Sequence, residues 1–218
     1  MNSRHWSGTG RKLLAVVTLV ATATSAHATV QVDSSMKYYD VVGTTSGAIL
    51  ASLDSLGPLV DGKRMWAKTH RKVNVNYHYR ADNDACRFTS VTTTLNIEIT
   101  MPQLVTKVSA HIRKWFDEKM KTLLEHEHGH RDIALGTAEN VDAAFTKMRA
   151  ATCKELIDNS REVFDEWTKK GNESQANYDV VTKSGLKQQA WPTTVDKKPV
   201  EARPSKDQSL EKLLFGRQ

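Results

Sequence analysis

The chain has 218 residues, of which 39% are hydrophobic and 26% are charged, and its formal net charge is +6. This length suits one domain with tails and argues against two large domains. No apolar run reaches the roughly 20 residues that a membrane-spanning helix requires, so we expect a soluble mature chain without a stable membrane span.

The first 28 residues have the pattern of a secretory signal peptide. Arg4, Arg11 and Lys12 precede the apolar run LLAVVTLVATATSA, and the small-residue pattern Ala26-His27-Ala28 closes it. We predict cleavage after Ala28 and a periplasmic or secreted protein, with an uncleaved membrane anchor as the alternative. Cleavage would leave 28 Lys and Arg against 25 Asp and Glu. This near balance predicts no specific nucleic-acid partner.

Strands are expected first in the domain, which we place at residues 29–190. MKYYDVVG, from Met36, suits a strand, and TSGAILASLDSLGP suits a helix that stops at Gly57-Pro58. KVNVNYHY and SVTTTLNIEITMP then alternate apolar and polar side chains, and the second run ends at Pro102. We therefore expect two or three antiparallel strands with one polar face.

After Pro102 the apolar period becomes helical. Apolar side chains from Ile112 to Met148 define one face of a long helix. Those from Leu156 to Trp167 predict a second helix that stops at Gly171-Asn172, followed by a shorter element in QANYDVVTKSGLKQQA. Residues 191–218 are polar, basic and proline-bearing, and we predict a flexible tail able to make weak contacts with anionic surfaces.

Cys86 and Cys153 are the two cysteines of the sequence. Because export would place them in an oxidising compartment, we predict that they form a disulfide, with two free thiols as the alternative. This bridge would tie the sheet to the second helix.

The stretch LLEHEHGHRD, residues 123–132, contains the motif HExxH as His126, Glu127 and His130. Residues four apart on a helix lie one turn above each other, so two imidazoles can reach one ion while the adjacent glutamate points at its water. At about 100° per residue, these three side chains fall within the apolar stripe of the long helix. A carboxylate on the core side needs compensation. We predict a zinc ion there, with a metal-free polar core cluster as the alternative.

Other acidic and histidine side chains are assigned by the same angular reasoning. A catalytic zinc needs a third protein ligand and an open position for water. Glu139 lies about 180° around the helix from His130 and is excluded unless Gly136 breaks the helix. Side chains that fall outside the apolar stripe are Glu125, His128 and Asp132. The third-ligand candidates that spacing leaves open are Glu155, Glu162 and Asp179.

Several segments occur in an order that resembles one family. They are YYDVVGTT with LGP, KVNVNYHY, Cys86 before the strand ending at Pro102, Trp115 upstream of HEHGHRDIA, and YDVVTKSG. Together, from about Tyr39 to Ala190, they resemble the bacterial domain-of-unknown-function family 922, described as predicted secreted zinc-dependent proteases. HExxH is the specific element among them.

The resemblance implies roles for individual residues. It makes His126 and His130 metal ligands and Glu127 the general base. The family's C-terminal element joins Tyr-Asp to a following Thr and a His-Gly step. In this chain the positions that match it are Tyr178, Asp179, Thr182 and Gly185, and Ser184 stands in place of the histidine. If that histidine is the family's third metal ligand, this chain lacks it, and we predict Asp179 as the third ligand instead.

These features predict an α+β, zincin-like fold, with a small antiparallel sheet packed against the long HExxH-bearing helix. The predicted function is zinc-dependent hydrolysis of peptides or proteins, in which a zinc-activated water attacks the carbonyl with Glu127 as general base. Tyr178 is a candidate hydrogen-bond donor to the oxyanion, with a structural role as the alternative. The rival functions are a non-catalytic zinc-binding envelope protein or scaffold, and an interaction protein that uses its basic tail.

Overall fold

The computed structural model describes residues 30–82 and 84–187, and it is a mixed α+β structure. The predicted signal peptide and the predicted tail lie outside the described residues. The elements in chain order are β1 (Gln31–Val41), α1 (Ser46–Leu56), β2 (Leu59–Val60), β3 (Lys63–Arg64), β4 (Lys68–Asp82), β5 (Ala85–Leu104), α2 (Ala110–Lys147), β6 (Arg149–Ala150) and α3 (Cys153–Thr182). No helix among the described residues has both the length and the apolar character that crossing a membrane requires.

The main sheet has the strand order β1-β5-β4, and β6 pairs with the N-terminal end of β5. β4 and β5 form a long antiparallel hairpin, as expected, but β1 pairs with β5 in parallel. The expectation of a purely antiparallel sheet was therefore wrong. Between β1 and β5 the chain passes through α1, the β2–β3 hairpin and all of β4, and this long connection lets β5 run in the direction of β1.

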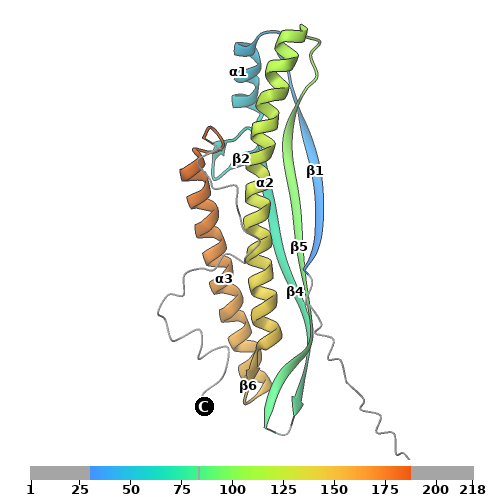
Figure 1. Cartoon of the computed structure of the whole chain (residues 1–218), viewed down its shortest axis with the longest axis vertical. Coiled ribbons are helices and arrows are strands. Elements are labelled where there is room, and N and C mark those ends of the chain that lie inside the picture. The colour runs from blue at the N-terminus through green and yellow to red at the C-terminus, as the bar shows by residue number, and fades with distance from the viewer. Residues whose placement is uncertain (1–29, 83, 188–218) are drawn as a thin grey trace, which may run out of the picture.

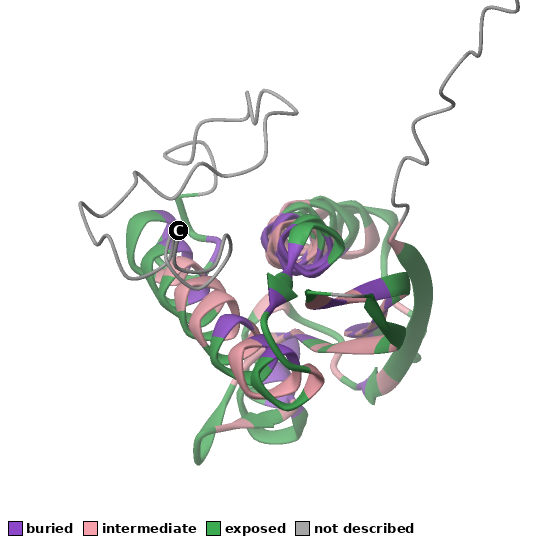
Figure 2. Ribbon diagram, turned by 90° about the horizontal axis from the view of Figure 1, so that it is seen from below, coloured by how far each residue is buried: buried purple, intermediate pink, exposed green. Residues whose placement is uncertain are grey.

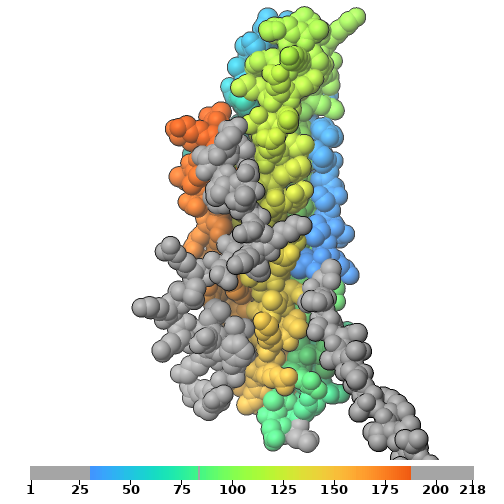
Figure 3. All heavy atoms as spheres, viewed as in Figure 1, coloured from blue at the N-terminus to red at the C-terminus, as the bar shows by residue number. Residues whose placement is uncertain are grey.

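β5 does not end at Pro102 but continues to Leu104. Its pairing with β4 reaches Thr100, opposite Lys68, so beyond that point β5 has β1 as its one neighbour in the main sheet. A proline is tolerated where a strand has an unpaired side, because its missing N–H then removes no ladder bond. β1 forms the edge of the main sheet opposite β4, and its side chains are largely exposed along one side of the molecule (Figure 3).

α2 packs along one face of the sheet, and α3 packs beside α2 (Figure 1). The sheet face under α2 is apolar, with Leu95, Ile97 and Ile99 against Ala134 and Ala138. A second apolar cluster joins the end of the hairpin to α2 and α3 through Phe88, Phe145, Leu156 and Val163, among others. Buried residues accordingly gather where the two helices and the sheet face one another (Figure 2).

α2 begins and runs as the apolar pattern predicts. Ser109 caps its N-terminus by accepting a hydrogen bond from the backbone N–H of Ile112. The helix is continuous through Gly136. Glu139 therefore stays on the side of the helix away from His130, and its exclusion as a ligand holds.

α3 is longer than predicted, because Gly171 does not end it. A Cβ atom at Gly171 would lie 2.5 Å from Thr137 Oγ1, so the glycine lets α3 approach α2 closely. The prediction of a helix stop there, with a separate short element after it, was wrong. The helix instead ends at Thr182, where Lys183 has left-handed backbone angles and its N–H returns to the carbonyls of the last turn.

The predicted disulfide between Cys86 and Cys153 is confirmed. It joins the start of β5 to the first residue of α3 and closes a loop with a sequence separation of 67. Both ends of the bridge lie against the apolar cluster that contains Phe88 and Leu156. The disulfide therefore fixes the N-terminal end of α3 to the sheet.

Removal of this bridge should lower the stability of the fold substantially. We expect the Cys86→Ala, Cys153→Ala variant to lose about 2–4 kcal/mol of unfolding free energy, since cross-linking restricts the unfolded chain most for long loops. Urea denaturation measures the loss, and a reducing agent should lower the midpoint of the wild type while leaving that of the variant unchanged. Equal midpoints for the variant and for the wild type without reducing agent would contradict the prediction.

Candidate metal centre

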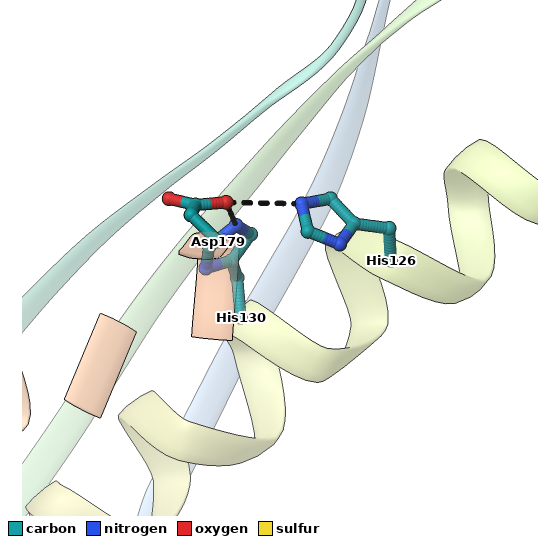
Figure 4. Close-up of side chains that lie close together, drawn as sticks. All are labelled: His126, His130 and Asp179. Carbon is teal, nitrogen blue, oxygen red and sulfur yellow. Dashed lines mark hydrogen bonds and ion pairs between the residues drawn. The ribbon is translucent and has the colours of Figure 1, made fainter. Parts of the chain in front are cut away.

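Three side chains that could hold a metal ion converge between α2 and α3. His126 and His130 come from α2 and Asp179 from α3, and their ligand atoms all lie within 4.8 Å of one another. The Nε2 atoms of His126 and His130 lie 3.2 and 3.1 Å from the same oxygen, Asp179 Oδ1 (Figure 4). The structure thus brings together the three residues that the sequence analysis singled out as ligands.

Two contacts fix which imidazole nitrogen carries the proton. Thr182 donates its hydroxyl to the Tyr178 carbonyl at 2.7 Å, so its oxygen accepts from His126 Nδ1, 3.3 Å away. Gln175 Oε1, which can only accept, lies 2.5 Å from His130 Nδ1. Each histidine therefore donates from Nδ1 and directs the lone pair of Nε2 toward Asp179.

Two neutral imidazoles would present lone pairs, without a donor, to a carboxylate oxygen. A cation between them removes this repulsion, and a bound metal ion or an added proton can supply it. The two nitrogen-to-oxygen separations of 3.1–3.2 Å are close to the roughly 3.4 Å expected between ligands of one tetrahedral ion with bonds of about 2.1 Å, and all three ligand atoms lie within 4.8 Å of one another. The donor set therefore fits a metal ion.

The pKa values of the centre respond to the same pairing. Without a metal ion, an added proton on Nε2 lets each imidazole donate to Asp179. Burial opposes the charge of Asp179, but these hydrogen bonds from His126 and His130 outweigh it and hold the pKa of the carboxyl well below its usual range. Burial likewise opposes a charged His130, but hydrogen bonds with Asp179 and Gln175 raise the pKa of this imidazole. The centre thus favours an ionised carboxylate next to positive charge.

Glu127 lies beside this group but outside the ligand set. Glu127 is 4% exposed, and its Oε2 atom accepts a hydrogen bond of 2.7 Å from the Thr69 hydroxyl on β4. His126 is equally enclosed at 3%, whereas the Asp179 side chain is 41% exposed. The ligand group is therefore closed on the side of the core and open on the side of α3.

Tyr178 forms the packing contact between the two helices at the centre. It is fully buried, its hydroxyl donates to the His126 carbonyl at 3.0 Å, and its ring stacks on that of His126 with centroids 4.8 Å apart. Gly129 makes room for the ring, because a Cβ atom there would lie 2.1 Å from the Tyr178 hydroxyl oxygen. These contacts support a structural role for Tyr178.

The remaining candidates do not join the centre. Glu125 and Asp132 are exposed on α2, and His128 is half-buried outside the ligand group. Glu155 and Glu162 lie nearer the start of α3 and also fall outside the group. Sequence reasoning missed two supporting residues, Thr69 and Gln175, and it named Thr182 as a match to the family element without giving it a role. Gln175 and Thr182 lie four residues before and three residues after Asp179, a spacing that identifies them once α3 is known to be continuous.

The centre opens into a cleft of about 890 Å³ between β4, α2 and α3. The cleft is lined by His126, Glu127, His130 and Asp179 together with every residue of β4 from Lys68 to Val73. Because residues of both faces of β4 contribute, the cleft borders the strand along its edge. That edge of β4 has no partner strand among the described residues.

Comparison with known protein families identifies a family that matches most of the chain. The family model described as "Bacterial protein of unknown function (DUF922)" matches residues 36–185, which include all three candidate ligands. No curated protein and no solved structure matches the chain significantly.

Proposed function

Because the chain belongs to DUF922, a bacterial family of unknown function, we propose its activity from the site itself: a zinc-dependent peptidase with a zincin-like arrangement. The main observation behind the proposal is that three candidate ligand atoms and a buried glutamate, Glu127, line the same cleft. In this proposal His126, His130 and Asp179 hold the metal, and Glu127 is the general base.

The ligand set favours zinc. Two imidazole nitrogens and one carboxylate oxygen are a common set in catalytic zinc sites, which keep a fourth position open for water or substrate. The exposed side of Asp179 leaves room for such a position. A structural zinc site would instead be closed by a fourth protein ligand, and no fourth His, Cys, Asp or Glu of the described residues belongs to the group. This contrast disfavours the rival function of a non-catalytic zinc scaffold.

Each side chain then has a defined task. When bound, zinc would polarise a carbonyl and increase the acidity of water. Glu127 takes a proton from the attacking water and delivers it to the leaving amine. Thr69 donates to one carboxylate oxygen of Glu127 and so holds the base in one orientation. Thr182 and Gln175 orient the two imidazoles. Tyr178 would have to leave the His126 carbonyl before it could donate to an oxyanion.

The free edge of β4 supports a peptide as the substrate. An extended peptide can add to an unpaired strand edge through main-chain hydrogen bonds, which are independent of side-chain identity. The stretch Lys68–Val73 lies along the cleft that contains Glu127. A peptide on this edge would therefore pass the proposed base. The Cys86–Cys153 disulfide in turn supports the proposed location outside the cytoplasm.

Metal content and peptide hydrolysis together test the proposal. We expect about one zinc per chain for the protein purified without chelators, and almost none for the His126→Ala, His130→Ala variant. His128→Ala is the matched control, since this neighbouring histidine lies outside the ligand group and should retain zinc. Elemental analysis gives the zinc content, and a fluorogenic peptide library gives the activity. Absence of zinc from the wild type, even after zinc is supplied, would refute the metal centre, and zinc without hydrolysis of any peptide would refute the peptidase.

A further inference from the structure

The walls of the cleft carry an excess of positive charge. The Lys and Arg residues that line it are Arg64, Lys68, Arg71, Lys72 and Lys183. Glu127 and Asp179 belong to the metal centre, so within the described lining Asp61 is the one other carboxylate. None of those five cations forms an ion pair with another described residue. A ligand that enters the cleft therefore meets a positive surface around the centre.

Arg71 differs from an ordinary surface cation because its side chain is half-buried. Its Nη2 atom donates to Asn172 Oδ1 on α3 at 3.0 Å, and a neutral amide cannot balance the charge of the guanidinium. Burial accordingly lowers the pKa of Arg71, although Asp179 partly opposes this shift. A guanidinium has five N–H donors in a planar fork, which matches the two oxygens of a carboxylate. Arg71 thus has donors and charge left to bind one.

The position of Arg71 relative to the proposed base follows from the geometry of β4. Thr69 and Arg71 are two residues apart and so lie on the same face of the strand, about 7 Å from each other. Thr69 is the residue that contacts Glu127. A carboxylate bound by Arg71 would therefore lie about two residue lengths of extended peptide from the reacting bond.

We propose that Arg71 selects substrates with a carboxylate about two residues from the scissile bond, so that the cleft takes acidic peptides. The inference rests on the proposed peptidase function and names its substrate class. The carboxylate can come from an Asp or Glu side chain or from the free C-terminus of the peptide. Lys68, Lys72 and Lys183 surround this contact with further positive charge.

Binding to an inactive protein tests the preference separately from turnover. We would use zinc-loaded Glu127→Gln protein and four labelled peptides that share one sequence. One has a central Gln and an amidated C-terminus, two replace that Gln by Glu or Lys, and the last keeps Gln but has a free C-terminal carboxylate. Fluorescence anisotropy at low salt gives Kd for each, and the wild type gives kcat/KM for the same series. A stronger binding of the Glu peptide or of the free-acid peptide tells which carboxylate is recognised.

We expect one of these carboxylate peptides to bind about tenfold more tightly than the neutral peptide, and the Lys peptide to bind most weakly. Arg71→Gln should reduce the preference to less than about twofold, and Arg71→Lys should restore part of it because it keeps the charge without the fork. The control is Arg80→Gln, which removes an exposed arginine of β4 outside the cleft and should keep the full preference.

The possible failures are distinguishable. If peptides are cleaved by the wild type and bind equally whatever their charge, the inference is overturned and the peptidase stands. A preference that survives in Arg71→Gln, or a preference for the Lys peptide, also overturns it. If no peptide binds and none is cleaved, the proposed function fails, and the inference fails with it.

Discussion

The Glu127→Gln variant is expected to retain about one zinc per chain and to hydrolyse peptides about 10²–10⁴-fold more slowly than the wild type, measured as kcat. Glutamine keeps the shape of the side chain and an oxygen that can accept from Thr69. It cannot take a proton from water at neutral pH. Because Glu127 lies outside the ligand group, its replacement should leave metal binding intact.

Glu125→Gln is the matched control for this prediction. Glu125 is exposed and lies two residues earlier on α2, so its replacement removes the same charge without touching the cleft. We expect unchanged zinc content and unchanged kcat. Loss of zinc from Glu127→Gln would instead assign Glu127 to the ligand set, and full activity of that variant would remove it from the mechanism.

The Gly129→Ala variant is expected to be destabilised by about 2–3 kcal/mol or more, an effect of overpacking. The new methyl group would lie 2.1 Å from the Tyr178 hydroxyl oxygen and 2.3 Å from the Cζ atom of its ring. Tyr178 is fully buried, so its ring can move only if the side chains packed around it move as well. Its displacement would move the next residue, Asp179, away from the two histidines. Zinc affinity should therefore fall about tenfold or more.

Gly47→Ala provides the comparison. Gly47 lies in α1, is exposed, and has no atom within 4 Å of the position that a Cβ would take. Alanine is the better helix former, so this variant should be as stable as the wild type or slightly more stable. Thermal denaturation and a competition titration with a zinc chelator measure both variants. A Gly129→Ala protein that behaves like Gly47→Ala would show that the two helices can separate at Tyr178 without cost.

Helices and strands whose apolar side chains repeat at a regular spacing could be predicted from the sequence. Strand pairing could not, because it depends on residues far apart in the chain. The stripe of α2 was visible because apolar side chains recur every three or four residues from Ile112 onward. The same stripe placed His126 and Glu127 on the buried side, where the structure has them. The direction of β1 left no trace in its own residues, because a parallel and an antiparallel edge strand alternate alike.

Two glycines show how a local signal can mislead or be overlooked. Gly171 has the appearance of a helix stop, yet it serves the close approach of α3 to Thr137, a residue of another helix. Asp61-Gly62 is a strong hairpin signal that the sequence analysis did not use. Both residues have positive φ, and they connect β2 to β3. The first error left the segment from Gln175 onward as a separate element, so the helical spacing between Gln175 and Asp179 was not used. The second omitted a small hairpin beside the cleft.

α3 is held to the sheet by the disulfide at its start, and the proposed metal would hold it near its other end. The disulfide fastens its first residue, Cys153, and the proposed metal would fasten Asp179, about 39 Å further along the helix axis. Each attachment restricts the motion of the helix and so raises the effective concentration of the partners at the other end. By thermodynamic linkage the two effects would be reciprocal: an intact disulfide would tighten binding of the proposed metal, and the bound metal would make the disulfide harder to reduce. The protein would therefore bind zinc most strongly where its cysteines are oxidised, and would release it more readily where they are reduced.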